Sequence, residues 1–552
     1  KFKFFKKKIK ADAIITDQKK QPIAILTADC VPILLYDYKK NMIAAIHAGW
    51  KGAFKEIIKR VVFFMIRKGC NRKNIIAAIG PCIGNKSYNV KDDFFKKFIK
   101  KNKKNKIFFK KKKNILYFDL PNFVKFQLKS NKITNIDRIS PHSVTIPGAI
   151  DGWSQMLDAH GTMSLGDLLQ PAIKFAYDGF PIHHRVSSDW SDCTEGLKND
   201  PTAAQYYLIE NRAPAIGEVI KLPLLGKALE YISKKGREGF YEGWIAEDIV
   251  KFLRDKGGLH TLEDFEKTKG DFVTPIKTIY RGYEVWECPP NGQGIIALEI
   301  LNILSGLDLN KLEPLSAERL HLEIEAARIA YRDRDAILAD PKTSNMPIEK
   351  WLSEDYAASQ RSLINRSRRM TKMPPTVLTN HKDTVYLTVV DKDRNAVSFI
   401  NTLFFPFGSS QVAPKSGIIL QNRGMGFNLE DGHPNCIGPN KRPLHTIIPG
   451  MLMKNGKAQM PFGVMGGQYQ AAGHAHFISN LLEWPMDLQE AIDFTRVFPD
   501  VDDPNEQVQV ESTLPQNIRA EIESMGHKTY IPQRPIGGAQ AIWIDWENSV
   551  PR

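Results

Sequence analysis

Long apolar runs are missing from this sequence of 552 residues. None approaches the ~18–20 apolar residues that a helix needs to cross a bilayer, so we expect no membrane partner. The basic start, K-F-K-F-F-K-K-K, is followed by neither a long apolar core nor a small-residue cleavage site. The sequence therefore predicts a cytoplasmic protein without an export signal.

Closely spaced cysteines are missing as well. The six cysteines are scattered along the chain, which favours a reducing compartment and argues against a disulfide framework. They are Cys30, Cys70, Cys82, Cys193, Cys288 and Cys436.

Acidic residues are scarce in only one part of the chain. Residues 1–140 hold 31 Lys and 4 Arg against 9 acidic residues, a net charge of +26, whereas the remaining 412 residues have a net charge of −10. Lysine runs can bind nucleic acid. Here, however, Lys, Asn, Ile and Phe are abundant together, and no nucleic-acid motif is present. We interpret the charge as a solvated surface and expect no nucleic-acid partner.

A linker is also missing where the two compositions meet, near residue 140. No Gly/Ser-rich or Pro-rich stretch separates them, as a working fusion would often have. Two origins are open: a natural bifunctional fusion, or an artificial join of two gene fragments. The abrupt change of composition favours the join.

Apolar runs dominate the basic segment. They predict buried strands over 11–17, 23–37, 42–50 and 75–84, and helical spacing predicts a helix over 52–68. Cys30 and His47 lie at or near the ends of two of these strands. A thiolate and an imidazole placed in this way can share a zinc ion, although two ligands make an incomplete site.

Three blocks in this segment resemble the laccase-domain family: T-A-D-C-V-P-I-L, H-A-G-W-K-G and I-G-P-C-I-G. Members of that family are described as polyphenol oxidases and purine nucleoside phosphorylases. The resemblance implies that Cys30 and His47 are zinc ligands. The family's upstream histidine and its C-terminal block are absent, so we expect a partial α/β laccase-like domain over residues 1–138.

Helices and strands are mixed in the second segment. The patterns predict helices over 148–161, 165–180, 225–257 and 315–338, a hairpin over 274–290, strands over 384–391, 396–403 and 417–421, a strand entering a glycine turn over 460–467, and helices over 470–483 and 487–494.

The run D-T-V-Y-L-T-V-V-D places Thr384 at the head of an apolar, β-branched stretch. Residues 366–383, which precede it, are rich in Pro and charge and favour neither helix nor sheet. A threonine at a new N-terminus carries a hydroxyl nucleophile and an α-amine whose pKa of about 7.7–8.0 suits a base. Cleavage of the Asp383–Thr384 bond would therefore make an N-terminal-nucleophile hydrolase. The alternative is that Thr384 merely starts an ordinary strand.

Six blocks in one order resemble the gamma-glutamyltransferase family from about residue 142 to the end. They are T-I-P-G-A-I-D-G-W, Y-R-G-Y-E-V, P-P-N-G-Q-G, the run at Thr384, G-P-N-K-R-P-L and M-G-G. The resemblance implies an α+β protein with a four-layer αββα sandwich. It also implies self-cleavage into a large chain, here residues 140–383, and a small chain, residues 384–552, which stay associated.

The resemblance assigns roles to individual residues. Thr384 is the expected nucleophile, and the hydroxyl of Thr402 is expected to contact it and to assist cleavage. The backbone N–H groups of Gly466 and Gly467 are expected to form the oxyanion hole, because fixed amides stabilise the charge of a tetrahedral intermediate.

Substrate-holding positions depart from the family pattern. Phe404 replaces an Asn, Arg423 replaces a Gln or Glu, and Gly426 replaces an Asp, while His445 and Thr446 stand where two serines are common. Without a carboxylate at position 426, a substrate α-ammonium loses its counter-charge. Arg423 can instead pair with a substrate carboxylate, or it can be a solvated surface arginine. The pattern resembles a side branch with glutaryl- or cephalosporin-acylase-like members.

We therefore predict an enzyme that transfers the acyl group of γ-glutamyl or glutaryl-type amides to water or an amine without a cofactor. We expect weak affinity for glutathione and a better fit to acyl groups that lack the α-amine. The family's opening and closing portions are absent, so we expect a truncated transferase domain. The alternative is a zinc-dependent purine nucleoside phosphorylase or polyphenol oxidase formed by the first segment. A third reading is a non-catalytic basic binding module.

Overall fold

The computed structural model describes residues 11–19, 21–37, 39–80, 82–84, 87–112, 115–130, 138–371, 385–429, 432–500, 506–548 and 550–551. The chain forms two compact units, residues 1–137 and residues 138–552.

The first unit is built on an antiparallel sheet with the strand order β1-β3-β2-β4. Its strands are β1 (Ala13–Thr16), β2 (Val31–Asp37), β3 (Met42–Ala48) and β4 (Ile75–Ile79). Helices α1 (Trp50–Phe54) and α2 (Ile57–Arg67) pack on β3, and α4 (Leu120–Ser130) packs on β2. A small sheet of β5 (Asn89–Val90), β7 (Ile115–Phe118) and β6 (Phe109–Lys112) accompanies α3 (Asp92–Lys101).

Three expectations for this unit were wrong in part. Residues 23–30 are not a strand, since β2 begins only at Val31. The side chains of β2 are not all buried: Leu34 is 55% exposed, because the helices of the described part cover one face of the sheet. The predicted helix over 52–68 is broken at Glu56, whose φ of +60° is left-handed.

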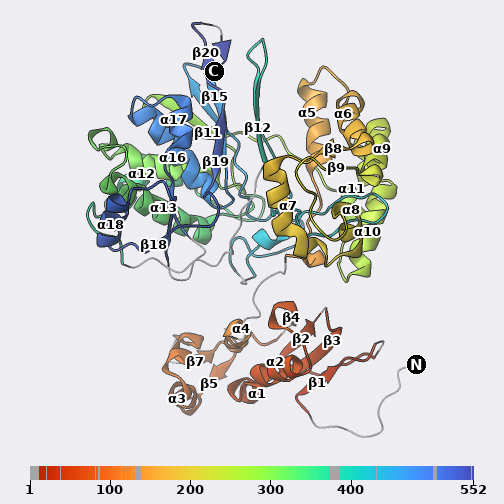
Figure 1. Ribbon diagram of the computed structural model, residues 1–552. Helices are drawn as coiled ribbons and strands as arrows, with labels where there is room; N and C mark the ends of the chain where they lie inside the picture. The colour runs from red at the N-terminus through yellow and green to blue at the C-terminus, as the bar shows by residue number, and fades with distance from the viewer. Residues whose placement is uncertain are drawn as a thin grey trace. The chain divides into compact units, whose positions relative to one another are not determined.

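The second unit begins with a lobe of helices, drawn in orange and yellow-green in Figure 1. The helices are α5 (Ala149–His160), α6 (Leu165–Asp178), α7 (His184–Leu197), α8 (Pro201–Tyr207), α9 (Pro223–Tyr241), α10 (Trp244–Asp255) and α11 (Leu262–Glu266). Strands β8 (Phe180–Pro181) and β9 (Val219–Ile220) pair between them. Gly161 and Gly179 follow α5 and α6, as the sequence predicts.

A five-stranded antiparallel sheet forms the centre of the rest of this unit. Its order is β10-β11-β14-β15-β19, with strands β10 (Ile276–Tyr280), β11 (Tyr283–Glu287), β14 (Gly450–Lys454), β15 (Lys457–Met465) and β19 (Gly538–Ala541). The hairpin of β12 (Val385–Val390) and β13 (Ala396–Asn401) packs against β15. Figure 1 shows the hairpin on the side of the sheet opposite the helices described next.

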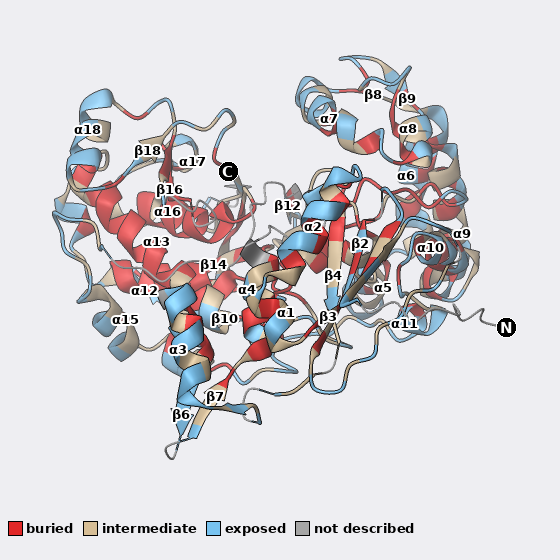
Figure 2. Ribbon diagram, turned by 90° about the horizontal axis from the view of Figure 1, so that it is seen from below, coloured by how far each residue is buried: buried red, intermediate tan, exposed pale blue. Residues whose placement is uncertain are grey.

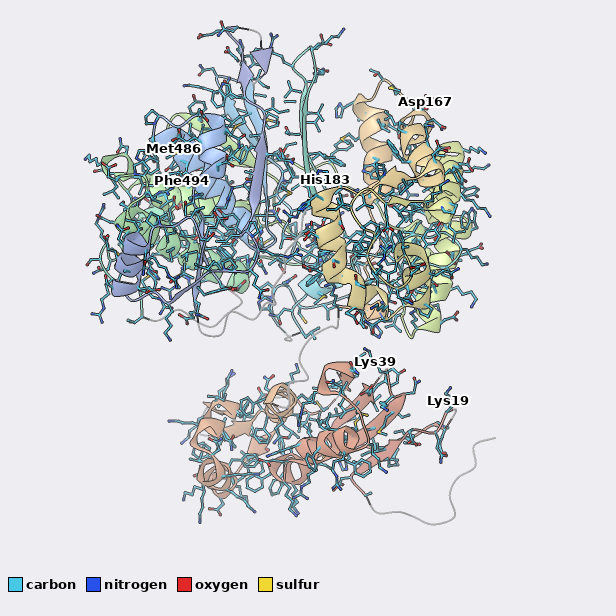
Figure 3. The ribbon with its side chains drawn as sticks, viewed as in Figure 1. Lys19, Lys39, Asp167, His183, Met486 and Phe494 are labelled. Atoms are coloured by element: carbon cyan, nitrogen blue, oxygen red, sulfur yellow. The ribbon has the colours of Figure 1, made fainter. Side chains whose placement is uncertain are left out.

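Helices α12 (Gly294–Ser305) and α16 (Tyr469–Glu483) cover the other face, and α13 (Ala317–Ile337) packs on α12. They are mostly buried (Figure 2), and their apolar side chains form the largest core cluster together with the sheet. In Figure 3 the labelled Met486 and Phe494 lie close to this layer. The remaining elements are α14 (Ile348–Trp351), α15 (Glu354–Arg361), α17 (Leu488–Asp493), α18 (Gln516–Ser524), β16 (Val497–Pro499), β17 (Val508–Val510), β18 (Thr529–Tyr530), β20 (Ile544–Asp545) and β21 (Val550–Pro551).

The predicted strand over 417–421 was wrong. This segment makes only an isolated bridge, between Val412 and Ile419, among the described residues. Leu420 is nevertheless buried inside a core cluster, and Ile418 packs against it. The apolar character of this run reflects its packing in the interior and not pairing in a sheet. Across the described ranges, no helix is both long enough and apolar enough to span a membrane.

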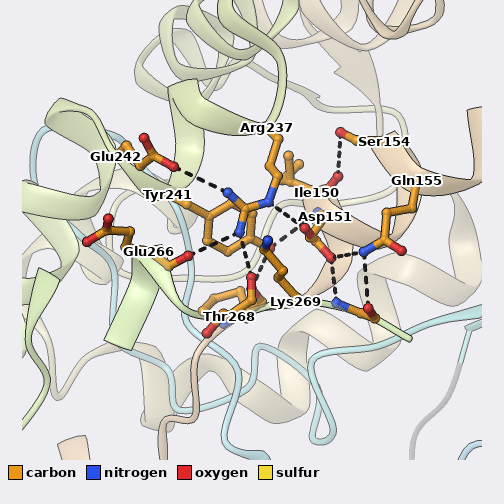
Figure 4. Close-up of polar contacts among 12 residues, drawn as sticks. Ile150, Asp151, Ser154, Gln155, Arg237, Tyr241, Glu242, Glu266, Thr268 and Lys269 are labelled. Carbon is orange, nitrogen blue, oxygen red and sulfur yellow. Dashed lines mark hydrogen bonds and ion pairs between the residues drawn. The ribbon is translucent and has the colours of Figure 1, made fainter. Parts of the chain in front are cut away.

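A buried carboxylate, Asp151, fixes the start of α5 within the helical lobe (Figure 4). It accepts hydrogen bonds from Arg237 Nε at 2.5 Å, Gly270 N at 2.5 Å and Gln155 Nε2 at 2.7 Å. Arg237 also donates to the carbonyl of Thr268 at 2.6 Å. One carboxylate thus joins α5 and α9 to the loop after α11.

We expect Asp151→Asn to lower the free energy of unfolding by about 3 kcal/mol at pH 7, because it leaves Arg237 without its buried partner. Burial by itself would raise the pKa of Asp151, but the hydrogen bonds from Gly270, Arg237 and Gln155 lower it below its ordinary value. The stabilisation is therefore complete above the unfolded pKa of about 3.9 and is lost as the pH falls through the folded value. Urea unfolding at pH 7 and pH 3 checks this.

The matched control for this prediction is Asp158→Asn, an exposed position on the same helix. It should leave the unfolding free energy unchanged at both pH values. An equal loss in both variants, or a loss in Asp151→Asn that does not shrink at low pH, would contradict the role of Asp151.

Candidate active site

Several chain segments meet at one end of β15. In the hairpin, Val385 pairs with Asn401, so β12 begins where β13 ends and Thr402 follows. The ring of Tyr386 lies against Gly463 of β15, where a β-carbon would clash with it. The glycine turn, Gly466 and Gly467, directly follows Met465, the last residue of β15.

The predicted cleavage site, Asp383 and Thr384, lies outside the described residues, so its role stays a prediction. Thr402 lies next to the first described residue of β12, and its Oγ1 accepts a hydrogen bond from Phe404 N at 3.0 Å. Its predicted contact with the nucleophile therefore also stays a prediction.

Gly466 and Gly467 form a turn between β15 and α16. Their φ angles are +136° and +58°, a region that favours glycine, and a β-carbon on Gly466 would lie 2.8 Å from the Ile536 carbonyl oxygen. Neither backbone N–H donates to an acceptor within the described ranges. Both precede the N-terminus of α16, whose dipole favours negative charge. The turn therefore has the chemistry of an oxyanion site.

Arg423 belongs to a short 3₁₀ turn, Arg423–Gly426, and is buried. Its Nη1 donates to Thr446 Oγ1 at 3.2 Å, and its guanidinium lies over the ring of Phe404 with Cζ 3.7 Å from the ring centroid. Among the described residues, no carboxylate contributes to the electrostatics of this guanidinium. Burial lowers the pKa of this guanidinium well below its ordinary value. The alternative of a solvated surface arginine is therefore wrong.

Phe404 and Gly426 stand where the family usually has an Asn and an Asp, and the backbone at each position is unusual. Phe404 is buried with a φ of +81°, a strained conformation for a bulky residue. At Gly426 a β-carbon would lie 2.7 Å from the Leu444 carbonyl oxygen, so an aspartate does not fit this backbone.

His445 and Thr446 lie on the segment facing Arg423. Thr446 is buried, and its hydroxyl accepts the hydrogen bond from Arg423. Burial, and then the charge of Arg423, lower the pKa of His445 well below its ordinary value, so His445 is neutral. The structure thus brings Arg423, His445 and Thr446 together, as the sequence analysis expected of substrate-binding residues.

Gln293 is a member of the site that the sequence analysis did not identify as such. Its buried side chain donates through Nε2 to Thr446 O at 3.1 Å and to Gly467 O at 3.2 Å, and its Oε1 accepts from Arg334 Nη1 at 3.2 Å. The side-chain amide of Gln293 therefore joins the glycine turn to Thr446, whose hydroxyl accepts the hydrogen bond from Arg423. The only signal in the sequence was the block P-P-N-G-Q-G.

We expect Gln293→Met to lower kcat about 10- to 100-fold, because two carbonyls and Arg334 lose a buried partner worth about 1–3 kcal/mol. The assay is steady-state hydrolysis of an acyl anilide. Gln509→Met is the matched control: Gln509 is also buried and donates to Asp500 at 2.9 Å, away from the turn. An unchanged kcat, or an equal fall in the control, would contradict a positioning role for Gln293.

Cys30 and His47 lie close together in the first unit. A β-carbon built on Gly49 would lie 2.9 Å from Cys30 Sγ and 3.8 Å from His47 Nε2, and His47 Nδ1 is 3.5 Å from Asp12 Oδ1. Burial, Asp29 and Asp12 raise the pKa of the Cys30 thiol, which disfavours the thiolate that binds zinc. In the part of the chain that the structure describes, no third ligand completes a metal cluster with these two residues.

Comparison with known proteins identifies both parts of the chain. Residues 120–550 match the gamma-glutamyltranspeptidase family, and residues 3–146 match the multi-copper polyphenol oxidoreductase laccase family. Because the first match spans most of the chain, the protein belongs to the gamma-glutamyltranspeptidase family.

Named relatives are hydrolases and acylases. The chain is 37% identical over 350 residues to the glutathione hydrolase-like YwrD proenzyme of Bacillus subtilis (strain 168), covering 63% of this chain and 66% of that protein. It is 33% identical over 418 residues to the glutathione hydrolase proenzyme of Escherichia coli (strain K12), covering 72% and 71%. The structure of a cephalosporin acylase from Bacillus halodurans matches with a TM-score of 0.69 and 35% identity, covering 75% of this chain and 76% of that one.

These matches confirm the two family resemblances and the predicted fold class. The chain spans about two thirds of the length of the first of these relatives. The roles of individual site residues, the cofactor requirement and the cytoplasmic location stay predictions.

Proposed function

We propose that this protein is a self-cleaving N-terminal-threonine amidohydrolase that prefers acyl groups with a terminal carboxylate and no α-amine, such as glutaryl. The observation that carries this preference is the buried Arg423 guanidinium, on which no described carboxylate acts. A buried cation without a counter-ion is costly, and a substrate carboxylate would offset that cost. The similarity to a cephalosporin acylase supports the same branch of the family.

The proposed chemistry begins when the Asp383–Thr384 bond is cut. The free α-amine of Thr384 takes the hydroxyl proton as its oxygen attacks the amide carbonyl. The Gly466 and Gly467 N–H groups stabilise the resulting oxyanion, a contribution of about 10²–10³ in rate per donor. The ammonium returns the proton to the leaving amine, and water then hydrolyses the ester on Thr384, or an amine takes up the acyl group. These steps require no metal or organic cofactor.

The direct test compares γ-glutamyl and glutaryl p-nitroanilides on the full chain. We expect a higher kcat/KM for the glutaryl compound, and intact-mass measurement should show two chains divided between residues 383 and 384. A clear preference for the γ-glutamyl compound would overturn the substrate assignment. A folded, active and uncut chain would overturn the proposed nucleophile.

A second candidate function, purine nucleoside phosphorolysis or polyphenol oxidation by the first unit, is favoured by the family match over residues 3–146 and by the proximity of Cys30 and His47. Zinc content and phosphate-dependent release of adenine from adenosine test it. The loss of adenine release in a Cys30→Ser, His47→Ala double variant would assign the activity to this pair.

A further inference from the structure

Three buried metal-ligating side chains cluster away from the candidate active site. His321 and Glu325 lie one turn apart on α13, and His527 lies between α18 and β18. Their ligand atoms all lie within 4.8 Å of one another, and no other such group of three occurs in the described ranges. Helix α13 packs against α18 (Figure 1), so the cluster joins segments about 200 residues apart in the sequence.

The hydrogen bonds of His321 suit a metal ligand. Its Nε2 lies 2.7 Å from the Asn365 carbonyl oxygen, which can only accept, so Nε2 carries the proton. Its Nδ1 therefore carries the lone pair and accepts a hydrogen bond from His527 Nε2 at 2.7 Å, a bond that a metal ion would replace. A metal-bound histidine usually donates its outer N–H to a backbone carbonyl in this manner.

His527 is buried, and its Nδ1 has no hydrogen-bond partner in the described part of the chain. An unpaired buried nitrogen beside two other ligands calls for an explanation.

Glu325 supplies the negative charge of the cluster. Its Oε1 accepts from Arg328 at 2.7 Å and its Oε2 accepts from Met370 N at 2.8 Å, and each oxygen keeps a further lone pair. Arg328 and Arg369 each form an ion pair with Glu506. The positive charges of the two arginines are therefore balanced by the carboxylates of Glu325 and Glu506.

We propose that His321, Glu325 and His527 bind one divalent transition-metal ion of the zinc class, with a water molecule as the fourth ligand. Two imidazoles and a carboxylate are a donor set that suits zinc. Tetrahedral zinc with bonds of about 2.0–2.1 Å places its ligand atoms roughly 3.3 Å apart, so the two imidazoles would separate slightly on binding.

The site would have a structural consequence. His321 and Glu325 precede residue 383, and His527 follows it. If the chain is cut there, which rests on the proposed function, the ion would join the large chain to the small chain. Metal binding itself does not depend on cleavage.

The test uses the full chain in a background that carries Cys30→Ser and His47→Ala, which removes the other candidate zinc donors. After treatment with a chelator, added Zn²⁺ should bind with one equivalent, and added Co²⁺ should give the visible bands of tetrahedral coordination. Glu325→Gln and His527→Gln should each weaken Zn²⁺ binding at least ~100-fold. The matched control is His476→Gln, a buried histidine paired with Glu323 at 2.9 Å, which should bind Zn²⁺ as the background does.

Binding far below one equivalent in the background protein, or unchanged binding in both ligand variants, would overturn the proposal. X-ray absorption at the zinc edge of the background protein covers the case in which a variant fails to fold: two imidazoles with oxygen ligands support the site, and sulfur ligands or a single imidazole overturn it. The same titration on Thr384→Ala in this background, with the cleavage state read by mass, separates a failure of cleavage from a failure of metal binding.

Discussion

Thr384→Ala should leave the protein as one uncut chain and lower acyl-anilide hydrolysis at least ~10⁴-fold, because it removes the proposed nucleophile. The same hydroxyl is proposed to serve cleavage and turnover, so both should be lost together. Intact mass under denaturing conditions measures the first effect, and steady-state kinetics measures the second. Circular dichroism should show that the variant is folded.

Thr379→Ala is the control for this prediction. It removes a threonine hydroxyl from the same segment of the sequence, five residues earlier, but not from the proposed new N-terminus. Cleavage and kcat should match those of the wild type. A fully active Thr384→Ala protein would refute the proposed mechanism, and a cut but inactive one would separate maturation from catalysis.

Arg423→Met should lower kcat/KM for the glutaryl anilide about 100-fold and leave hydrolysis of butyryl anilide nearly unchanged. Butyryl lacks the carboxylate that we place against Arg423, and a charged hydrogen-bonded pair in a buried site is worth about 2–3 kcal/mol. The ratio of kcat/KM for the two anilides is the informative quantity, because general damage to the site lowers both values together.

Arg423→Lys keeps the charge without the planar fork, so its ratio should lie between those of the wild type and Arg423→Met. Bidentate pairing predicts that it lies closer to Arg423→Met. An equal loss on both anilides would show that Arg423 supports the fold through Phe404 and Thr446 and does not read the acyl group.

The local sequence pattern was sufficient to predict the hairpin and the glycine turn. Residues 384–391 and 396–403 were predicted as strands, and the structure has Val385–Val390 and Ala396–Asn401, because β-branched apolar residues in short runs favour a sheet. The run over 23–30 failed although it is equally apolar: Leu26 there is 95% exposed. A strand needs a pairing neighbour, and periodicity in one segment does not reveal whether one is available.

The candidate site was predictable only where a family pattern pointed to single positions. Arg423 and Thr446 were both identified, and their hydrogen bond is present. Gln293 was not, because its partners lie 153 and 174 residues further along the chain and are brought to it only by packing of the sheet and helices. The burial of Gln293 and its contacts with three partners depend on the tertiary fold, and the local sequence carries no pattern that reveals them.

The carbonyl of Leu444 beside Gly426 bears on any attempt to redesign this enzyme. Introducing an aspartate at position 426 to recruit amino-acid donors would push a side chain into main-chain atoms 2.7 Å from its first carbon. A single substitution would therefore cost folding before it changed selectivity. Conversion would require rebuilding the neighbouring loop first, so specificity here is encoded in backbone shape as much as in side-chain identity.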